Sequence, residues 1–321
     1  MIHTKTFACG LQFAFRRTRS QVAYSALAIK SGTRNEPEAF SGIAHMTEHM
    51  LFKGTARRTP QQISNRLEML GGELNAYTAK EETVLYSTVL REDTAKAVDL
   101  LFELAFTSTY PQKELDKERC VVIDEINMYK DSPSECIFEE FERMLFEPSP
   151  LARPILGTTK SLKKIDSAAL QSYVRENFRP ENMCIAIVGN LTPQRAEKIA
   201  LQSLMVVVDD IALDPCIIRI KKQGAAGGHN GLSNIEACLG TQGYNRLRVG
   251  VGQAFGRGQQ VDYVLGQFPA EDLPAMEAAV GEACNAVRCF VTQGIDRTMN
   301  LYNKKGTAHG SSELEVKNQE L

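Results

Sequence analysis

Hydrophobic and polar residues follow two kinds of pattern over the first 130 residues, and each pattern predicts a type of element. Partly alternating runs rich in β-branched and aromatic residues predict strands at residues 9–16, 22–31, 73–79 and 83–90. Stretches almost free of Gly and Pro, some with apolar residues three and four apart, predict helices at residues 41–52, 61–70, 93–107 and 112–129. The expected fold class is α+β, an antiparallel sheet backed by helices.

The pattern changes character near residue 204. Residues 205–211 form a run typical of a buried strand that ends in two acidic residues, and residues 221–232 form a Gly-rich loop. Helices are predicted after this loop, at residues 232–239 and 271–292. These features predict a partial α/β segment, so the expected domains are residues 1–200 and 204–303, with a polar and disordered tail at residues 304–321.

Composition narrows the class of protein and its compartment. The 321 residues are 43% hydrophobic and 24% charged with a formal net charge of −2, so no overall charge imbalance indicates nucleic acid or a membrane. No basic segment precedes an apolar run near the first residue, and no stretch approaches the ~18 apolar residues of a membrane span. The eight cysteines include no C-x-x-C pair. We therefore expect a cytoplasmic protein with reduced thiols and no membrane partner.

A pair of histidines one helical turn apart is the first candidate for chemistry. His45, Glu48 and His49 form an H-x-x-E-H pattern in the predicted helix at residues 41–52. Positions four apart lie on one face of a helix, so both imidazoles can bind one metal ion, and Glu48 shares this face. This order of residues is the inverted zincin motif. A catalytic zinc site still needs a third protein ligand.

A later helix carries two acidic residues on one face. Glu118 and Glu125 are seven residues apart, which is two turns of the predicted helix at residues 112–129. Carboxylates that share a face with an apolar stripe are costly to bury unless they meet a cation, which a zinc site would supply. The alternative is that both side chains simply face solvent.

The first part of the chain resembles the pitrilysin, insulinase and mitochondrial-processing-peptidase family of inverted zincins. The resemblance is collinear over residues 5–195 and rests on residues 42–55 around the histidines, followed by residues 72–78, 153–158 and 182–190. It implies that His45, His49 and Glu125 hold one Zn²⁺ per chain, with a fourth position left for water.

The same resemblance implies roles for the neighbouring residues. Glu48 would be the general base, and Glu118 would orient a ligand or the base. Asn75 and Ala76 would bind an extended peptide by strand addition, so the implied substrate is a peptide or an unfolded protein. Family members continue into a second half that this chain lacks. A partner subunit that supplies this half is therefore an expected partner.

Residues 204–303 are similar to the C-terminal half of bacterial-type peptidyl-tRNA hydrolase. The similarity rests on residues 228–232, 239–242, 246–252 and 261–268, and on the predicted helix that follows. It implies that Asp209 would orient a catalytic histidine and that Asn230 would hold substrate or water. The catalytic histidine belongs to the half that is missing here, so this mechanism is incomplete. Basic residues within residues 221–248 would still allow weak, salt-sensitive tRNA binding.

Three hypotheses follow from these features. The first is a zinc-dependent metalloendopeptidase whose activity is impaired by truncation, and its ligand set is complete. The second is a peptidyl-tRNA hydrolase or tRNA-binding module. The third is a non-functional chimeric reading frame, because the chain passes from one family to another without an exposed linker. The first hypothesis is preferred.

Overall fold

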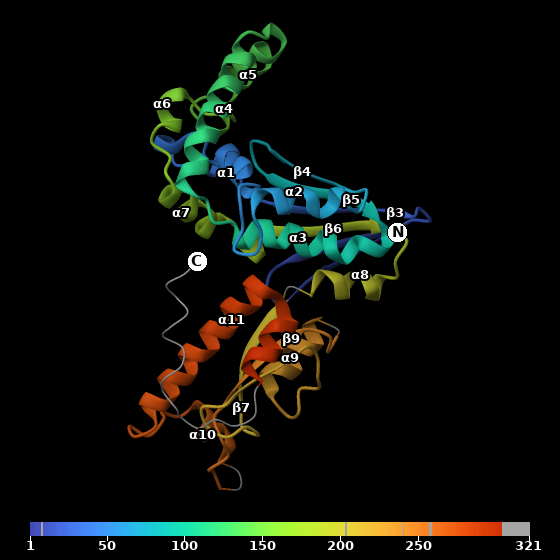
Figure 1. Cartoon of the computed structure of the whole chain (residues 1–321), viewed down its shortest axis with the longest axis vertical. Coiled ribbons are helices and arrows are strands. Elements are labelled where there is room, and N and C mark those ends of the chain that lie inside the picture. Colours follow the sequence, from blue (N-terminus) through green and yellow to red (C-terminus); the bar gives the residue numbers. More distant parts are fainter. Residues whose placement is uncertain (8, 203, 240, 257–258, 304–321) are drawn as a thin grey trace. The chain divides into compact units, whose positions relative to one another are not determined.

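The computed structural model describes residues 1–303 except residues 8, 203, 240, 257 and 258 (Figure 1). The chain forms two compact units, of which the first comprises Met1–Leu204 with Ala226–Tyr244. The second comprises Met205–Ala225 with the residues from Asn245 onward. The tail expected at residues 304–321 lies outside the described residues, and the expected domain limits stay predictions.

The first unit is built on a six-stranded sheet with the strand order β1–β2–β6–β3–β5–β4. Its strands are β1 (Ile2–Thr6), β2 (Gln12–Arg17), β3 (Val22–Ile29), β4 (Glu73–Thr78), β5 (Thr83–Leu90) and β6 (Met183–Gly189). Most neighbours are antiparallel, but β2 and β6 are parallel. The expected antiparallel sheet is therefore wrong at this pair. The connection to β6 is much longer than the dozen or so residues that a parallel crossover needs.

The described helices of the first unit follow the predicted ones closely, and three further helices lie between residues 133 and 177. They are α1 (Ile43–Leu51), α2 (Pro60–Glu68), α3 (Thr94–Thr107), α4 (Gln112–Lys130), α5 (Pro133–Phe146), α6 (Thr159–Leu162), α7 (Ser167–Asn177), α8 (Pro193–Ala200) and α9 (Asn230–Leu239). Short 3₁₀ helices lie at Thr33–Asn35, Glu38–Phe40, Arg91–Asp93, Pro150–Ala152 and Pro180–Asn182. Among the described residues, no helix is long and apolar enough to cross a membrane.

One face of the six-stranded sheet forms the core. Alternate residues of the strands are buried on this face, among them Phe13, Phe15, Leu27, Leu85 and Ile185. Helix α3 packs on β3 and β5 and helix α8 on β2, while α1 and α2 contact the edge strand β4 (Figure 1). Successive side chains of β4 point to opposite faces of the sheet. Every second residue of this strand therefore faces the same side as α1, and this places side chains of β4 beside the candidate site.

Two glycines meet where α1 begins. Gly42 has φ +91°, and a Cβ there would lie 2.7 Å from the carbonyl oxygen of Leu156. A Cβ on Gly157, with φ +72°, would lie 2.3 Å from the carbonyl oxygen of Ser41. Any side chain at either position would force the two backbones apart. The segment after α5 therefore crosses directly over the first turn of α1.

The second unit has a three-stranded sheet of order β7–β9–β8. Strand β7 (Met205–Asp210) runs parallel to β9 (Asn245–Gly250), and β8 (Ile218–Lys221) runs antiparallel to it. Helix α11 (Leu273–Tyr302) packs on one face of the sheet through Ala283 and Ala286, and α10 (Gln260–Leu265) precedes it. Among the described residues, β7 is an edge strand with one neighbour.

Candidate metal centre

Helix α1 places two imidazoles side by side. His45 and His49 lie one turn apart, and their ring centroids are 4.6 Å from each other. His45 is 8% exposed, because α1 packs against β4, α4 and α7. The predicted position of both side chains on one helix face is confirmed.

Glu125 reaches the same point from α4. Its Oε2 atom lies 3.8 Å from Nε2 of His45 and 3.7 Å from Nε2 of His49. These distances are too long for hydrogen bonds. They are close to the roughly 3.4 Å that separates two ligand atoms on a tetrahedral zinc ion with bonds of about 2.1 Å. The three ligand atoms lie within 4.8 Å of one another and fit one metal ion.

The protonation state of His45 favours metal binding. Burial, together with the neighbouring His49, lowers the pKa of His45 from its ordinary 6.5 to about 3. The imidazole is therefore neutral at physiological pH, which is the form that binds a metal.

Glu118 and Lys53 fix the ring of His49. Glu118 Oε2 lies 3.1 Å from Nδ1 of His49, and its Oε1 accepts a hydrogen bond of 2.7 Å from Nζ of Lys53. Burial raises the pKa of Glu118, but the bonds from Lys53 and His49 outweigh burial and lower the pKa overall. A carboxylate can only accept, so Nδ1 of His49 carries the proton and Nε2 is left for a metal.

Glu48 lies beside the cluster with one clear partner. Its Oε2 atom accepts a hydrogen bond of 2.7 Å from the hydroxyl of Thr78 on β4. Burial raises the pKa of Glu48, and this outweighs the lowering effects of Thr78 and His49. A carboxylate whose pKa is raised is the kind of group that takes and gives a proton near neutral pH.

A second buried carboxylate holds the start of α1. Oε2 and Oε1 of Glu36 accept hydrogen bonds of 2.9 Å from the backbone N–H groups of Gly42 and Ala44. These donors belong to the free N–H groups at a helix N-terminus, where negative charge is favoured. Burial raises the pKa of Glu36 to about 7, although both backbone bonds, Arg153 and Lys80 lower it.

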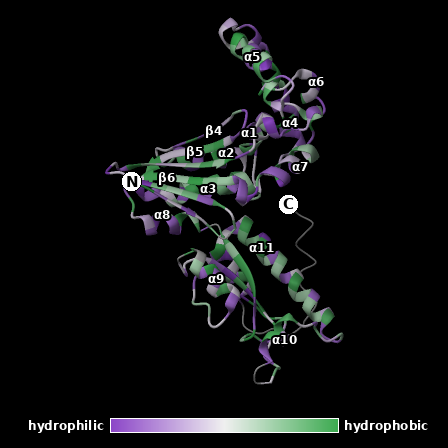
Figure 2. Cartoon of the chain, turned by 180° about the vertical axis from the view of Figure 1, so that it is seen from behind, coloured by the Kyte–Doolittle hydropathy of each residue, from purple (hydrophilic) through white to green (hydrophobic). Residues whose placement is uncertain are grey.

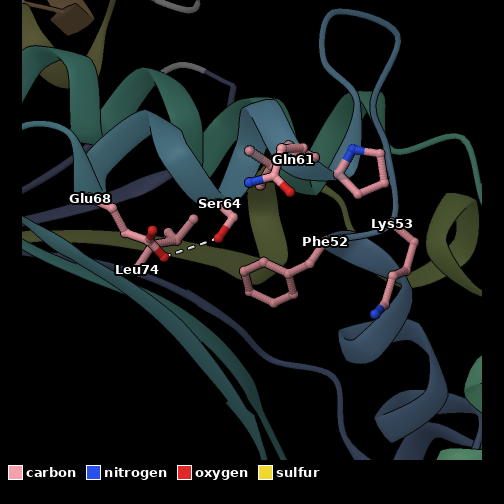
Figure 3. A pocket seen from close by; sticks show the side chains of 8 residues that line it. Phe52, Lys53, Gln61, Ser64, Glu68 and Leu74 are labelled. Atoms are coloured by element: carbon pink, nitrogen blue, oxygen red, sulfur yellow. Dashed lines mark hydrogen bonds between the residues drawn. The ribbon is translucent and has the colours of Figure 1, made fainter.

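A cavity of about 350 Å³ opens between the end of α1, helix α2 and strand β4. Figure 3 shows Phe52 and Lys53, which follow α1, on one side and residues of α2 on the other. Glu68 on α2 accepts a hydrogen bond of 3.0 Å from Ser64. Lys53 therefore borders both the cavity and the bond network of His49.

The two residues expected to bind peptide lie on β4. This strand has one neighbour in the sheet, so one row of its backbone groups is open among the described residues. Ala76 is half-buried on the same face as Thr78, whereas Asn75 is on the opposite face. The amide oxygen of Asn75 accepts a hydrogen bond from N–H of Ala76. Their role in binding peptide stays a prediction.

The candidate residues of the tRNA-hydrolase-like part are dispersed. Asp209 lies in β7, where it pairs with Val249 in the register, and Asn230 is the first residue of α9. Arg246 is 1% exposed, and Arg248 lies 3.2 Å from Asp210. These two arginines, which the sequence offers as basic residues for tRNA, are therefore engaged within the protein.

Other charges of this region also have partners. Lys222 lies 2.5 Å from Asp296, and Nδ1 of His229 accepts a hydrogen bond from N–H of Leu232 in the first turn of α9. His229 therefore caps a helix. The roles of Asp209 and Asn230 stay predictions.

Two site residues, Lys53 and Thr78, were not singled out by sequence reasoning. Lys53 lies four residues after His49, and Thr78 lies two residues after Ala76 on the same face of β4. Four residues make about one helical turn and two residues make one strand repeat, so spacing alone could have placed Lys53 near His49 and Thr78 beside Ala76. Neither residue type marks a metal site by itself, so only contacts with Glu118 and Glu48 identify them.

Comparison with known families agrees with this geometry. Residues 13–159 match the insulinase family, peptidase family M16, and residues 164–207 match the peptidase M16 inactive domain. Residues 187–309 match peptidyl-tRNA hydrolase. The two resemblances in the sequence are thus confirmed.

Curated relatives cover only part of this chain and are themselves covered only in part. An uncharacterized zinc protease YmxG of Bacillus subtilis is 35% identical over 164 residues, which is 51% of this chain and 40% of the relative. The β subunit of the mitochondrial-processing peptidase of Dictyostelium discoideum is 32% identical over 212 residues, 64% of this chain and 45% of the relative. The chain spans less than half the length of these relatives.

Solved structures share the fold at lower identity. A peptidase M16 inactive domain from Pseudomonas fluorescens has a TM-score of 0.59 at 21% identity, over 68% of this chain and 58% of that one. Pitrilysin has a TM-score of 0.55 at 20% identity, over 68% of this chain and 27% of that one. The chain thus carries the N-terminal domain of an M16 (insulinase-family) peptidase, and its C-terminal part carries a peptidyl-tRNA hydrolase segment.

Proposed function

We propose that this protein is a zinc-dependent metalloendopeptidase that hydrolyses peptide bonds in peptides or unfolded proteins. The observation that carries the proposal is the convergence of His45, His49 and Glu125, with Nε2 of both rings within 3.8 Å of one carboxylate oxygen. Two neutral nitrogen donors and one carboxylate oxygen are the donor set of catalytic zinc sites. A bound zinc ion would lower the pKa of a water molecule and polarise the scissile carbonyl.

Glu48 and Glu118 take different parts in this proposal. Glu48, held by Thr78 at 2.7 Å, accepts the proton of the attacking water and passes it to the leaving amine. Glu118 keeps the proton of His49 on Nδ1 and so directs Nε2 toward the cluster. The two carboxylates are suited to these roles because burial leaves the pKa of the first raised, whereas Lys53 and His49 together lower the pKa of the second in spite of burial.

The open edge of β4 is the proposed place for substrate. An extended peptide would pair with the free backbone groups of this strand, next to Asn75 and Ala76. Thr78, on the same strand, contacts the proposed base, so a paired peptide would pass beside Glu48. The cavity lined by Phe52 and Leu74 would take one substrate side chain.

Metal analysis combined with three substitutions tests the proposal. The wild-type chain is expected to retain about one zinc ion after dialysis and to cleave a denatured protein in a chelator-sensitive reaction. Glu125→Gln should lose the metal. Glu48→Gln should keep the metal and lose activity by about 10²–10⁴-fold, the usual contribution of a general base. The exposed Glu38→Gln serves as a matched control. Folded wild-type protein that takes up no zinc contradicts the proposal.

A partner subunit is a further part of the proposal. The match of this chain to the M16 inactive domain covers residues 164–207, and the chain spans 40% of the B. subtilis relative. We expect a partner subunit that carries such an inactive domain to raise the peptidase activity.

A second candidate function, tRNA binding, rests on the match of residues 187–309 to peptidyl-tRNA hydrolase. Lys221 is exposed and remains the best candidate for a phosphate contact. The expected affinity is weak and falls steeply with salt. Gel-shift titrations of the wild type and Lys221→Ala with tRNA at two salt concentrations test this function, and equal binding by both proteins contradicts it.

A further inference from the structure

Helix α5 presents a hydrophobic stripe to solvent. No described side chain of this 14-residue helix is buried, although six of the residues are large and apolar. The exposed ones are Ile137 at 68%, Phe138 at 69%, Phe141 at 60%, Met144 at 70%, Leu145 at 61% and Phe146 at 36%. Figure 1 shows α5 beyond the end of α4, away from the sheet, and Figure 2 shows green hydrophobic residues between purple hydrophilic ones along this helix.

The exposed residues gather on one face. Ile137, Phe138, Phe141, Met144 and Leu145 follow the spacing of three and four residues that places side chains on one side of a helix. Together with Phe146 they expose on the order of 800 Å², if a large apolar side chain spans about 150–250 Å² when fully open. Monomeric proteins seldom expose patches above about 300–600 Å². One partner of a standard interface buries about 800 Å².

The stripe is symmetric about its middle residue. Counted from Phe141, apolar residues lie three and four positions away in both directions, and the positions one and two away are charged on both sides. An antiparallel copy of the same helix would place Phe141 against itself, Phe138 against Leu145 of the second copy, and Ile137 against Met144 of the second copy. A surface that complements itself in this way is what a two-fold interface requires.

The charges that border the stripe have counter-ions within the same chain. Glu140 lies 2.6 Å from Arg143, and Glu142 lies 3.2 Å from Lys80. These ion pairs reduce the repulsion between the carboxylates of two copies without removing it. The borders remain acidic in balance, so salt should strengthen the contact by screening them.

We propose that α5 is a homodimer interface, in which the stripes of two copies pack antiparallel around Phe141. The occupant is a second copy of this chain. The proposal goes beyond the proposed peptidase function and does not depend on it, because neither zinc nor substrate takes part in the contact.

Sedimentation equilibrium of the full chain tests the proposal. The wild type is expected to populate a dimer at micromolar concentration, more strongly at 0.5 M than at 0.05 M NaCl. Phe141→Glu should raise the dissociation constant by at least about 100-fold, because the residue at the centre of the interface is lost from both copies. The matched control is Met69→Glu, whose side chain is 83% exposed outside α5, and it should dimerise like the wild type.

Site-directed photocrosslinking locates the interface. A benzophenone amino acid in place of Phe141 should crosslink two copies through α5, whereas the same group in place of Glu139, on the opposite face of the helix, should not. Circular dichroism shows whether each variant is folded. A monomeric wild type at 100 µM, a dimer that survives Phe141→Glu, or crosslinks outside α5 would overturn the proposal.

Discussion

At the scale of single residues, the candidate site depends on how the ring of His49 is held. Its Nδ1 atom lies 3.1 Å from Glu118, which in turn accepts a hydrogen bond from Lys53. Lys53 supplies the positive charge that makes an ionised Glu118 tolerable at 9% exposure. A residue that touches no metal therefore controls the direction of a metal-binding atom.

Replacing Lys53 tests this control. Lys53→Met should weaken zinc binding by about 10-fold or more, the usual effect of removing an outer partner of a metal ligand. Lys53→Arg should retain most of the affinity, because it keeps a charged donor. Competition with a chromogenic chelator measures both values. Equal affinities for the wild type and Lys53→Met would show that Glu118 holds His49 without help.

The sequence predicted the residues of the site unevenly. His45, Glu48 and His49 follow from one helical turn, because a fixed period places all three on one face. Glu125 lies on another helix and could be chosen over Glu118 only through the family resemblance. Thr78 was missed, because a threonine in a strand carries no chemical signal until its partner is known.

At the scale of elements, the start of α1 contains an acid that is buried against backbone donors. Burial raises the pKa of Glu36 from its ordinary 4.5 to about 7, despite the nearby charges of Arg153 and Lys80. The folded state therefore binds this proton more tightly than the unfolded state does. Stability from this group is fully present below pH 4.5 and is lost as pH rises through 7.

Unfolding at several pH values tests this linkage. Between pH 4.5 and 8, Glu36 should lower the free energy of unfolding of the wild type by up to roughly 3 kcal/mol. Glu36→Gln should lack this decrease, and the exposed Glu38→Gln should retain it. Urea titrations at pH 5 and pH 8 give the difference between variants. A pH dependence that is unchanged in Glu36→Gln would contradict the assignment.

The spacing of hydrophobic residues predicted the limits of the helices better than the directions of the strands in the sheet. Helices α1 to α4 begin and end within about two residues of the predicted limits, because each has a clear apolar face or a capping residue. Strand β6 runs parallel to β2, since a long crossover decides its direction and local sequence does not. Helix α5 was not predicted, although its apolar residues follow the spacing of a helix.

At the scale of the whole molecule, the second unit has an open sheet edge. Strand β7 pairs only with β9 among the described residues, and Val207 on it is 52% exposed. The unpaired N–H and C=O groups of such an edge can pair with another chain. An apolar open edge of this kind is a site for aggregation.

A single lysine should reduce that aggregation. Val207→Lys places a charge on the edge, which is a common protection of such strands, and should slow the increase in light scattering on warming. The control is Val261→Lys on α10, which is 62% exposed and outside any strand. Equal scattering by the wild type and Val207→Lys would show that another surface drives aggregation.

The expected domain limits rest on the hydrophobic pattern and the resemblances together, and they stay predictions. A change in pattern near residue 204 was visible in the hydrophobic runs, and the matches to two families overlap at residues 187–207. Physical reasoning on the sequence alone gave no way to tell which strands would lack neighbours. That property depends on partners that a local pattern does not contain.

Gly42 and Gly157 are in contact, so the chain between them forms a long loop whose two ends meet. All the proposed zinc-binding side chains lie between these two glycines, and so does the hairpin of α4 and α5. A nick in the turn between these two helices would therefore leave both ends of the segment anchored at one crossing. A methyl group added at the crossing would push the first turn of α1, and with it the two histidines, away from the segment that follows α5.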